Sequence, residues 1–300
     1  MVTRKNASAT AARGIEEKTQ SIPEPNPELG AGTAGKAQEP HPAGKVKHGL
    51  LVQLLRLVLF TTWFSIVIIC IHITQLVGAP LYWIDRDYYY AYMALTKQSF
   101  GILATTITQW FSPTVVRVSW NESMRGQIRK TEDGNLETLF PERLVLMANH
   151  QIYTDWLYLW WVAYANKMHG HIYIILKEQL KYVPFLGPGM MFYGFIFMAR
   201  KWASDKTRLA YRLGKLKSRH SGPMSGSASL DPMWLMIFPE GTNLSANTRK
   251  GSVKWATKQD IPDMRHALLP RSTGLQFCLS QLKGTVDWVY DCTMAYEGVP

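Results

Sequence analysis

A run of 23 residues, from Leu57 to Ala79, contains no Asp, Glu, Lys or Arg, and it constrains the fold more than any other feature. With a rise of about 1.5 Å per residue, a helix of this length crosses a hydrocarbon core of roughly 30 Å. The run is too long and lies too far into the chain for a signal peptide, and Trp63 and Trp83 are typical of a membrane interface. We therefore expect a membrane-anchoring helix, and a buried helix of a soluble core is the less favoured alternative.

A second apolar stretch, residues 88–111, is weaker because Lys97 and several Thr and Gln residues interrupt it. It is expected to lie in the membrane interface or to form a second anchoring segment, so residues 49–111 are assigned to a membrane anchor. The basic residues that precede the anchor favour a cytoplasmic N-terminus; they are Lys45, Lys47, His48 and Arg56. A single crossing would then place the rest of the chain in the lumen. A two-helix hairpin, or a pair of helices in one leaflet, would return it to the cytosol.

Residues 1–48 are rich in Ala, Gly, Pro, Glu and Lys and show no apolar periodicity. Such a segment cannot bury enough apolar surface to fold, so we expect a disordered tail. A mitochondrial presequence is the competing interpretation, but presequences contain few acidic residues. The glutamates that argue against it are Glu16, Glu17, Glu24 and Glu28.

Residues 112–300 differ from the preceding part, because short apolar runs alternate with helical patterns. Strands are expected at 114–120, 144–148, 171–176, 194–199, 234–238 and 286–296. Helices are expected at 155–166, 204–218, 245–258 and 273–282, and a surface loop at 220–232. The alternation predicts an α/β domain with a mixed, largely parallel sheet flanked by helices, preceded by the N-terminal anchoring segment.

The same region carries 23 Lys and Arg against 15 Asp and Glu, a net charge of +8. This excess suits anionic lipid head groups, coenzyme phosphates or nucleic acid, but no nucleic-acid-binding module accompanies it, so we expect no nucleic-acid partner. The helix expected at 204–218 either rests on an anionic leaflet or packs its leucines on the sheet. The cysteines show no metal-ligand spacing, so no metal site is expected; they are Cys70, Cys278 and Cys292.

A histidine and an aspartate, His150 and Asp155, follow the expected strand 144–148. On one regular helix these positions would lie about 140° apart, so they meet only if His150 lies in the turn before the helix and Asp155 in its first turn. There Asp155 can accept the Nδ1 proton of His150 and leave Nε2 free to take a proton from a hydroxyl, while Thr154 can cap the helix. A histidine at a strand end beside a capping aspartate is the commoner meaning of this short pattern taken alone.

Three further groups of polar residues follow expected strands or begin a helix. Arg200 ends the strand GFIFMAR and can bind a phosphate, although an arginine after a strand is usually a surface group. In FPEGTN, Glu240, Gly241 and Thr242 form a turn that can bind an anion, although a plain turn is the simpler alternative. LLPRSTG begins a helix whose N-terminus can hold an anion or a carbonyl oxygen.

In order and spacing, NHQIYTD, GFIFMAR, FPEGTN and LLPRSTG resemble the four sequence blocks of membrane-bound glycerolipid acyltransferases, the 1-acylglycerol-3-phosphate acyltransferase family. The blocks span Asn149 to Gly274. The longer segments YTDWLYLWW and LKYVPFLGPGMMFYGFIFMAR are most similar to the eukaryotic branch that contains lysocardiolipin and lysophosphatidylinositol acyltransferases. Members of that branch generally continue past the point that corresponds to Pro300, so we expect the chain to be truncated at its C-terminus.

The resemblance implies acyl transfer from acyl-CoA to the free hydroxyl of a lysophospholipid of the lysophosphatidic acid, lysophosphatidylinositol or lysocardiolipin class. It makes His150 the general base and Asp155 its orienting partner, and it assigns the fourth block, with Pro270, to the acyl donor. The residues that it assigns to the acceptor phosphate are Arg200, Glu240, Gly241 and Thr242. Because Glu240 is acidic, we expect it to position Arg200 or the turn rather than to contact the phosphate.

The resemblance implies no metal or prosthetic group, and acyl-CoA takes part as a co-substrate. Because the blocks contain no nucleophile with an adjacent base, we expect the lysophospholipid hydroxyl to attack the thioester directly. Acyl-CoA is cytosolic and too polar to cross a bilayer unaided, so the catalytic domain is expected to face the cytosol. The endoplasmic reticulum is the expected membrane. Two other functions remain open, an acyl-CoA thioesterase-like hydrolase and a non-catalytic membrane lipid-binding protein.

Overall fold

The structure is a computed structural model that describes residues 48–132, 136–217 and 230–296. The expected disordered tail lies outside the described residues apart from His48, and so do residues 220–229 of the expected surface loop. The helices are α2 (Leu50–Gly78), α3 (Leu81–Ile84), α4 (Arg86–Trp110), η1 (Glu122–Met124), α5 (Asp155–Ala165), η2 (Glu178–Tyr182), α6 (Leu186–Phe192), α7 (Trp202–Lys215), α8 (Ala246–Gln259) and α9 (Ser272–Leu282). The strands are β1 (Ile128–Lys130), β2 (Leu136–Thr138), β3 (Arg143–Ala148), β4 (Ile172–Lys177), β5 (Ile196–Met198), β6 (Met233–Ile237) and β7 (Val289–Cys292).

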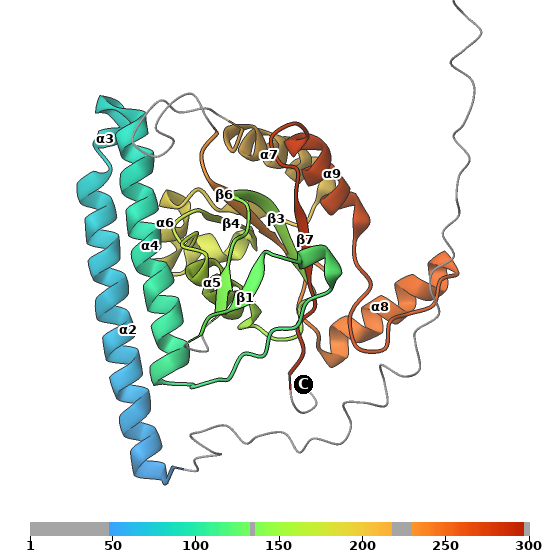
Figure 1. The fold of residues 1–300 in the computed structure, drawn as a ribbon, viewed down its shortest axis with the longest axis horizontal. Helices are drawn as coiled ribbons and strands as arrows, with labels where there is room; N and C mark the ends of the chain where they lie inside the picture. Colours follow the sequence, from blue (N-terminus) through green and yellow to red (C-terminus); the bar gives the residue numbers. More distant parts are fainter. Residues whose placement is uncertain (1–47, 133–135, 218–229, 297–300) are drawn as a thin grey trace, which may run out of the picture. The chain divides into compact units, whose positions relative to one another are not determined.

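Five strands form a parallel sheet in the order β5-β4-β6-β3-β7 (Figure 1). In β3, Val145 lies opposite Leu235 of β6 on one side and Val289 of β7 on the other. The inner strands read RLVLMA, IYIILK and MWLMI, and such nearly continuous apolar runs are typical of strands covered by helices on both faces. The predicted α/β fold with a largely parallel sheet is therefore confirmed. A separate antiparallel pair joins β1 to β2.

The strand expected at 114–120 is wrong, because these residues have no regular secondary structure and are exposed. Their Val and Thr residues give the segment a high local preference for extended backbone, but a strand also needs a neighbouring strand and a covered face. The last expected strand is shorter than 286–296, since β7 covers only Val289–Cys292.

Helices cover both faces of the sheet. Leu144 and Leu146 of β3 pack in one core cluster with α4 and α5, whereas Val145 packs in a second cluster with α7 and α9. The four helices expected in this domain are confirmed, with ends that differ from the expected ones by at most three residues. In α7, Leu209 and Leu213 are buried in the second cluster, so this helix packs its leucines on the sheet.

The N-terminal helices form a hairpin. Within the described part of the chain, Leu50–Ile84 is the one helical stretch long and apolar enough to cross a membrane, and its exposed apolar surface makes it a candidate membrane anchor. Near the start of α2, the Arg56 guanidinium donates to the carbonyl of Phe111 over 2.8 Å. Near its end, the Thr74 carbonyl accepts from the Tyr92 hydroxyl over 2.9 Å. These contacts show that α4 runs back along α2 (Figure 1).

The opposite side of α4 packs on the α/β domain. Phe100 contacts the rings of Trp156 and Trp160 in α5, with ring centroids 6.1 and 5.1 Å away. Lys97 is buried, and its Nζ lies 3.9 Å from the centre of the Tyr173 ring in β4. The lysine that interrupts the second apolar stretch therefore faces protein, and α4 connects the candidate anchor to the domain.

Candidate active site

The turn between β3 and α5 brings His150 and Asp155 together, as the sequence predicted. The Nδ1 atom of His150 lies 2.8 Å from Oδ2 of Asp155. The carboxylate of Asp155 is fully buried, and the same Oδ2 accepts the backbone N–H of Ile152 over 3.1 Å. Thr154 occupies the N-cap position of α5, but its side chain makes no capping hydrogen bond. A proton held on Nδ1 by the carboxylate leaves Nε2 of His150 as a proton acceptor.

Tyr296 is a part of this site that the sequence did not indicate. Its hydroxyl donates to Oδ1 of Asp155, so both carboxylate oxygens have donors. Partial burial and the neighbouring Asp155 raise the pKa of Tyr296, and its hydroxyl therefore stays protonated at neutral pH. Tyr296 lies 141 residues after Asp155 and reaches it because β7 is the neighbour of β3 in the sheet.

Contacts from neighbouring strands hold the catalytic turn, which we define as residues 149–155. The Asn149 amide donates to the carbonyl of Met294 over 3.0 Å and accepts the Met294 N–H over 2.6 Å. The His150 carbonyl accepts the N–H of Leu244 over 2.8 Å. The imidazole ring of His150 stacks on the Phe238 ring, with centroids 4.3 Å apart. The segments that follow β6 and β7 therefore fix the turn from two sides.

The third block forms a turn at the end of β6 that meets Arg200 from the end of β5. Gly241 has a φ of +72°, a left-handed conformation that favours glycine, and its N–H donates to the Phe238 carbonyl over 2.9 Å. The Arg200 guanidinium donates to the Gly241 carbonyl. Thr242, the next residue, is half-buried. The structure thus brings Arg200, Gly241 and Thr242 together at one edge of the sheet.

Glu240 is buried beside the catalytic turn, and one of its carboxylate oxygens has no hydrogen-bond partner among the described residues. Burial raises the pKa of Glu240, while hydrogen bonds from the backbone N–H groups of His150 and Leu268 act in the opposite direction. The carboxylate therefore contacts the catalytic turn and the first residue of the fourth block. Glu240 was expected to position Arg200 or the turn of the third block. Its contacts join the turn of the third block to the catalytic turn, whereas the Arg200 guanidinium donates to the Gly241 carbonyl, so the arrangement favours positioning of the turn of the third block.

The fourth block lies against the third. The Arg271 N–H donates to the Pro239 carbonyl over 2.8 Å, and α9 begins at the next residue. Pro270 is exposed directly before this contact. Partial burial and then the positive charge of Arg271 lower the pKa of Arg200, and burial followed by the charge of Arg200 lowers that of Lys177.

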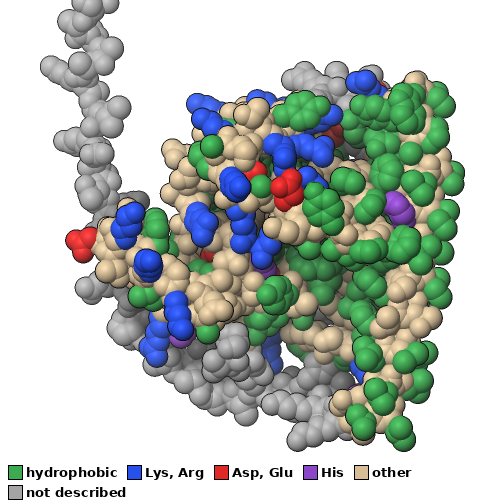
Figure 2. Space-filling view, turned by 180° about the vertical axis from the view of Figure 1, so that it is seen from behind, with side chains coloured by type: hydrophobic (Ala, Val, Ile, Leu, Met, Phe, Trp, Pro, Cys, Tyr) green, Lys and Arg blue, Asp and Glu red, His purple; other side chains and the backbone are tan. Residues whose placement is uncertain are grey.

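Arg200 is therefore close enough to Lys177 and to Arg271 for its charge to interact with both at the carboxyl edge of the sheet, and these three residues form a basic cluster. Basic side chains gather on the face shown in Figure 2, beside the hydrophobic surface of α2. The sequence singled out only Arg200 of the three, because Lys177 ends β4 and joins the site through the fold. Such a cluster suits a phosphate.

The described residues contain no group of three or more His, Cys, Asp and Glu side chains that could hold a metal ion. Burial raises the pKa of Cys278 to about 12, and burial with the neighbouring Asp291 raises that of Cys292 to about 11. Neither thiol is therefore a thiolate nucleophile at neutral pH.

Comparison with known proteins places this site in a family. The sequence model of the acyltransferase family matches residues 125–288, more than half of the chain. An uncharacterized acyltransferase of Schizosaccharomyces pombe is 37% identical over 76% of this chain and 63% of its own length. A 2-acyl-1-lysophosphatidylinositol acyltransferase of Saccharomyces cerevisiae is 38% identical over 68% of this chain and 58% of its own length.

A lysocardiolipin acyltransferase of Danio rerio is 34% identical over 53% of this chain and 39% of its own length. The chain thus spans less than two thirds of the length of these curated relatives. No solved structure matches it significantly. The family match includes the catalytic turn, the turn of the third block and the fourth block, and the chain belongs to the acyltransferase family.

Proposed function

We propose that the protein transfers an acyl group from acyl-CoA to the free hydroxyl of a lysophospholipid. The observation that carries this proposal is the pair formed by His150 and the buried Asp155 at the carboxyl edge of the sheet of an acyltransferase domain. Relatives that are named lysophosphatidylinositol and lysocardiolipin acyltransferases support a lysophospholipid acceptor. The cluster of Lys177, Arg200 and Arg271 supports an acceptor or donor that carries phosphate.

In the proposed reaction, Nε2 of His150 takes the proton of the acceptor hydroxyl while the hydroxyl oxygen attacks the thioester carbonyl. The new C–O bond forms a tetrahedral intermediate, whose oxyanion is stabilised by backbone N–H groups or by the N-terminus of α9. The C–S bond then breaks, and the leaving coenzyme A thiolate takes the proton from the imidazolium. Asp155 stabilises the imidazolium and keeps its orientation, with Tyr296 and Ile152 holding the carboxylate.

In the same proposal, Arg200 binds the acceptor phosphate together with Gly241 and Thr242, while Glu240 positions the turn of the third block. The fourth block, with Pro270, contributes to the acyl donor site. Arg200 suits its role because a guanidinium can form two parallel hydrogen bonds to a phosphate and already lies against the Gly241 carbonyl.

The substitution Arg200→Ala is expected to raise the KM for the lysophospholipid by about 10- to 100-fold, since a charged hydrogen bond is lost. The KM for acyl-CoA should change little. Arg200→Lys should restore part of the affinity, because lysine keeps the positive charge but lacks the planar guanidinium that forms two parallel hydrogen bonds to a phosphate. Lys258→Ala, which removes an exposed charge from α8, serves as the control for net charge. A larger effect on acyl-CoA than on the acceptor would assign Arg200 to the donor site instead.

The overall function is tested with the purified full chain, one acyl-CoA and a panel of lysophospholipids that differ in head group. We expect release of coenzyme A to depend on the added lysophospholipid and to match the diacyl product in amount. Equal release without any acceptor would identify a thioesterase. Binding of lysophospholipid without any release would identify a lipid-binding protein.

For location, we propose that the protein is anchored in the endoplasmic reticulum with its catalytic domain in the cytosol. The antiparallel α2 and α4 support this topology, because a hairpin returns the chain to its starting side. The chain has two described N-glycosylation sequons, Asn121-Glu-Ser and Asn243-Leu-Ser. Asn121 is exposed and Asn243 is buried, so a glycan on Asn121 is the better reporter of topology. Protease digestion of sealed microsomes should remove the domain, and a glycan on Asn121 would place it in the lumen.

A further inference from the structure

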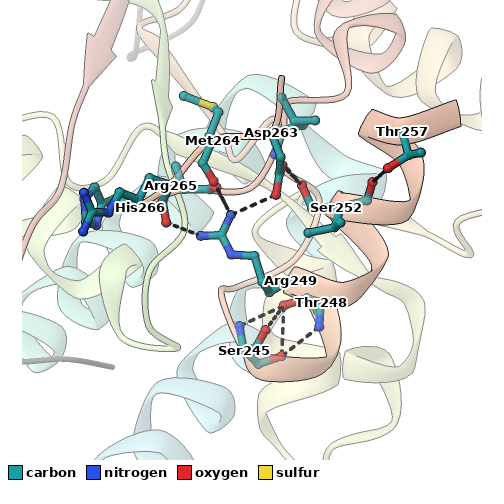
Figure 3. Close-up of polar contacts among 12 residues, drawn as sticks. Ser245, Thr248, Arg249, Ser252, Thr257, Asp263, Met264, Arg265 and His266 are labelled. Atoms are coloured by element: carbon teal, nitrogen blue, oxygen red, sulfur yellow. Dashed lines mark hydrogen bonds and ion pairs between the residues drawn. The ribbon is translucent and has the colours of Figure 1, made fainter. Parts of the chain in front are cut away.

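The loop between α8 and α9, residues 260–271, is held by one arginine of α8 (Figure 3). The Arg249 guanidinium donates to the carbonyls of Arg265 over 2.8 Å and Ala267 over 2.9 Å, and also to that of Met264. It lies 3.4 Å from a carboxylate oxygen of Asp263. A single side chain therefore binds four residues of the loop, on both sides of His266.

A second contact from α8 supports the same loop. The Ser252 hydroxyl donates to Asp263 over 2.7 Å (Figure 3). It also accepts the N–H of Leu269 over 3.2 Å. Ser252 lies on the same side of α8 as Arg249, three residues further along. The loop is thus held near its start and, through Leu269, within the fourth block.

The loop in turn contacts the catalytic turn. The carbonyl of His266, which lies between the carbonyls held by Arg249, accepts the side-chain amide of Gln151 over 2.7 Å. Gln151 directly follows His150 in the chain. The segments after β6 and β7 hold the catalytic turn at two points, and the loop supplies a third point of attachment.

We propose that Arg249 is a positioning residue for His150 that acts through the loop and Gln151. This inference rests on the proposed function only where it concerns the rate of acyl transfer. A planar guanidinium with several N–H groups can bind carbonyls that point from different residues of a loop, whereas a lysine ammonium is a compact point charge. Without the guanidinium, the loop loses these hydrogen bonds. The His266 carbonyl can then move, which weakens its hydrogen bond with the Gln151 side chain.

The kinetic test uses the full chain with Arg249→Lys, with Gln151→Ala and with both substitutions. Each single variant should lower kcat by about 5- to 20-fold and leave both KM values within about twofold, because orientation of the base is affected but substrate binding is not. The double variant should be no slower than the slower single variant, since both substitutions break one path. Lys250→Gln, at the exposed neighbour of Arg249, is the matched control and should match the wild type.

Reaction of His150 with diethyl pyrocarbonate, followed by mass spectrometry, gives a readout that needs no substrate. The rate should rise severalfold in both single variants, because a looser turn exposes the partly buried ring. Effects on kcat that multiply in the double variant would overturn the proposal, and so would an unchanged modification rate. If the wild type transfers no acyl group, the proposed function fails, and the modification rates alone decide the positioning role. If Arg249→Lys does not fold, Gln151→Ala still tests the last step of the path.

Discussion

Replacement of His150 by alanine is expected to lower kcat for acyl transfer by about 10²- to 10⁴-fold, the usual range for loss of a general base. The imidazole has the free Nε2, because its Nδ1 contacts Asp155. Asp155 cannot take over the role, since its oxygens accept hydrogen bonds from Ile152 and Tyr296. The rate of coenzyme A release, measured with saturating lysophospholipid, gives the size of the loss.

The His150→Ala variant should keep its fold and its membrane insertion. The attachment of the turn through the His150 carbonyl to Leu244 is a backbone contact and survives the substitution. Thermal unfolding and the amount of protein in the membrane fraction check this point. His150→Gln, which preserves a polar side chain without a base, should lose as much activity. If either variant keeps more than about a tenth of the wild-type kcat, His150 is not the general base.

Much of the site could be predicted because the carboxyl ends of parallel strands meet at one edge of a sheet. The sequence placed His150 after β3, Arg200 after β5 and Glu240 after β6, and all three lie at that edge in the structure. The spacing of His150 and Asp155 also required a turn followed by a helix, which the structure contains. The position of each residue relative to the end of its strand was therefore sufficient to predict where it lies.

Other parts could not be predicted, because they depend on which segments become neighbours. The segment 114–120 has the composition of a strand but finds no partner, so it stays exposed. Lys97 makes the second apolar stretch a poor membrane segment, yet hydropathy does not say that the helix faces protein on that side. Tyr296 and Arg249 belong to no short motif, and their roles depend on contacts with residues far away in the chain.

The catalytic turn thus depends on long-range contacts as much as on its own sequence. Asn149 is fixed by the segment after β7, His150 by the segment after β6 and Gln151 by the loop before α9. Each attachment comes from a different loop segment, the first two of which follow β7 and β6. The orientation of His150 is therefore fixed both by Asp155 in the same turn and by segments that are distant in sequence.

Replacement of Asp155 by asparagine is expected to lower kcat almost as much as loss of His150, by roughly 10²- to 10⁴-fold. The amide removes the negative charge that stabilises the imidazolium. In one of its two orientations the amide also presents an N–H group to Nδ1 of His150. The ring proton then lies on Nε2, and Nε2 can no longer accept a proton from the hydroxyl. The KM values should change little, because Asp155 is fully buried and contacts His150, Ile152 and Tyr296 rather than substrate.

The matched control for Asp155→Asn is Tyr296→Phe, which removes one donor to the same carboxylate and leaves its charge. Its loss of kcat should be only about 3- to 10-fold, consistent with a single hydrogen bond to a charged group. The pKa of Tyr296 is raised, so its hydroxyl stays protonated across the neutral pH range in the wild type. The larger loss of kcat in Asp155→Asn than in Tyr296→Phe should therefore be seen at every pH in this range. Steady-state assays of both variants from pH 6 to 8 test this. Equal losses in the two variants would mean that the charge of Asp155 is unimportant and that the carboxylate serves only to build the turn.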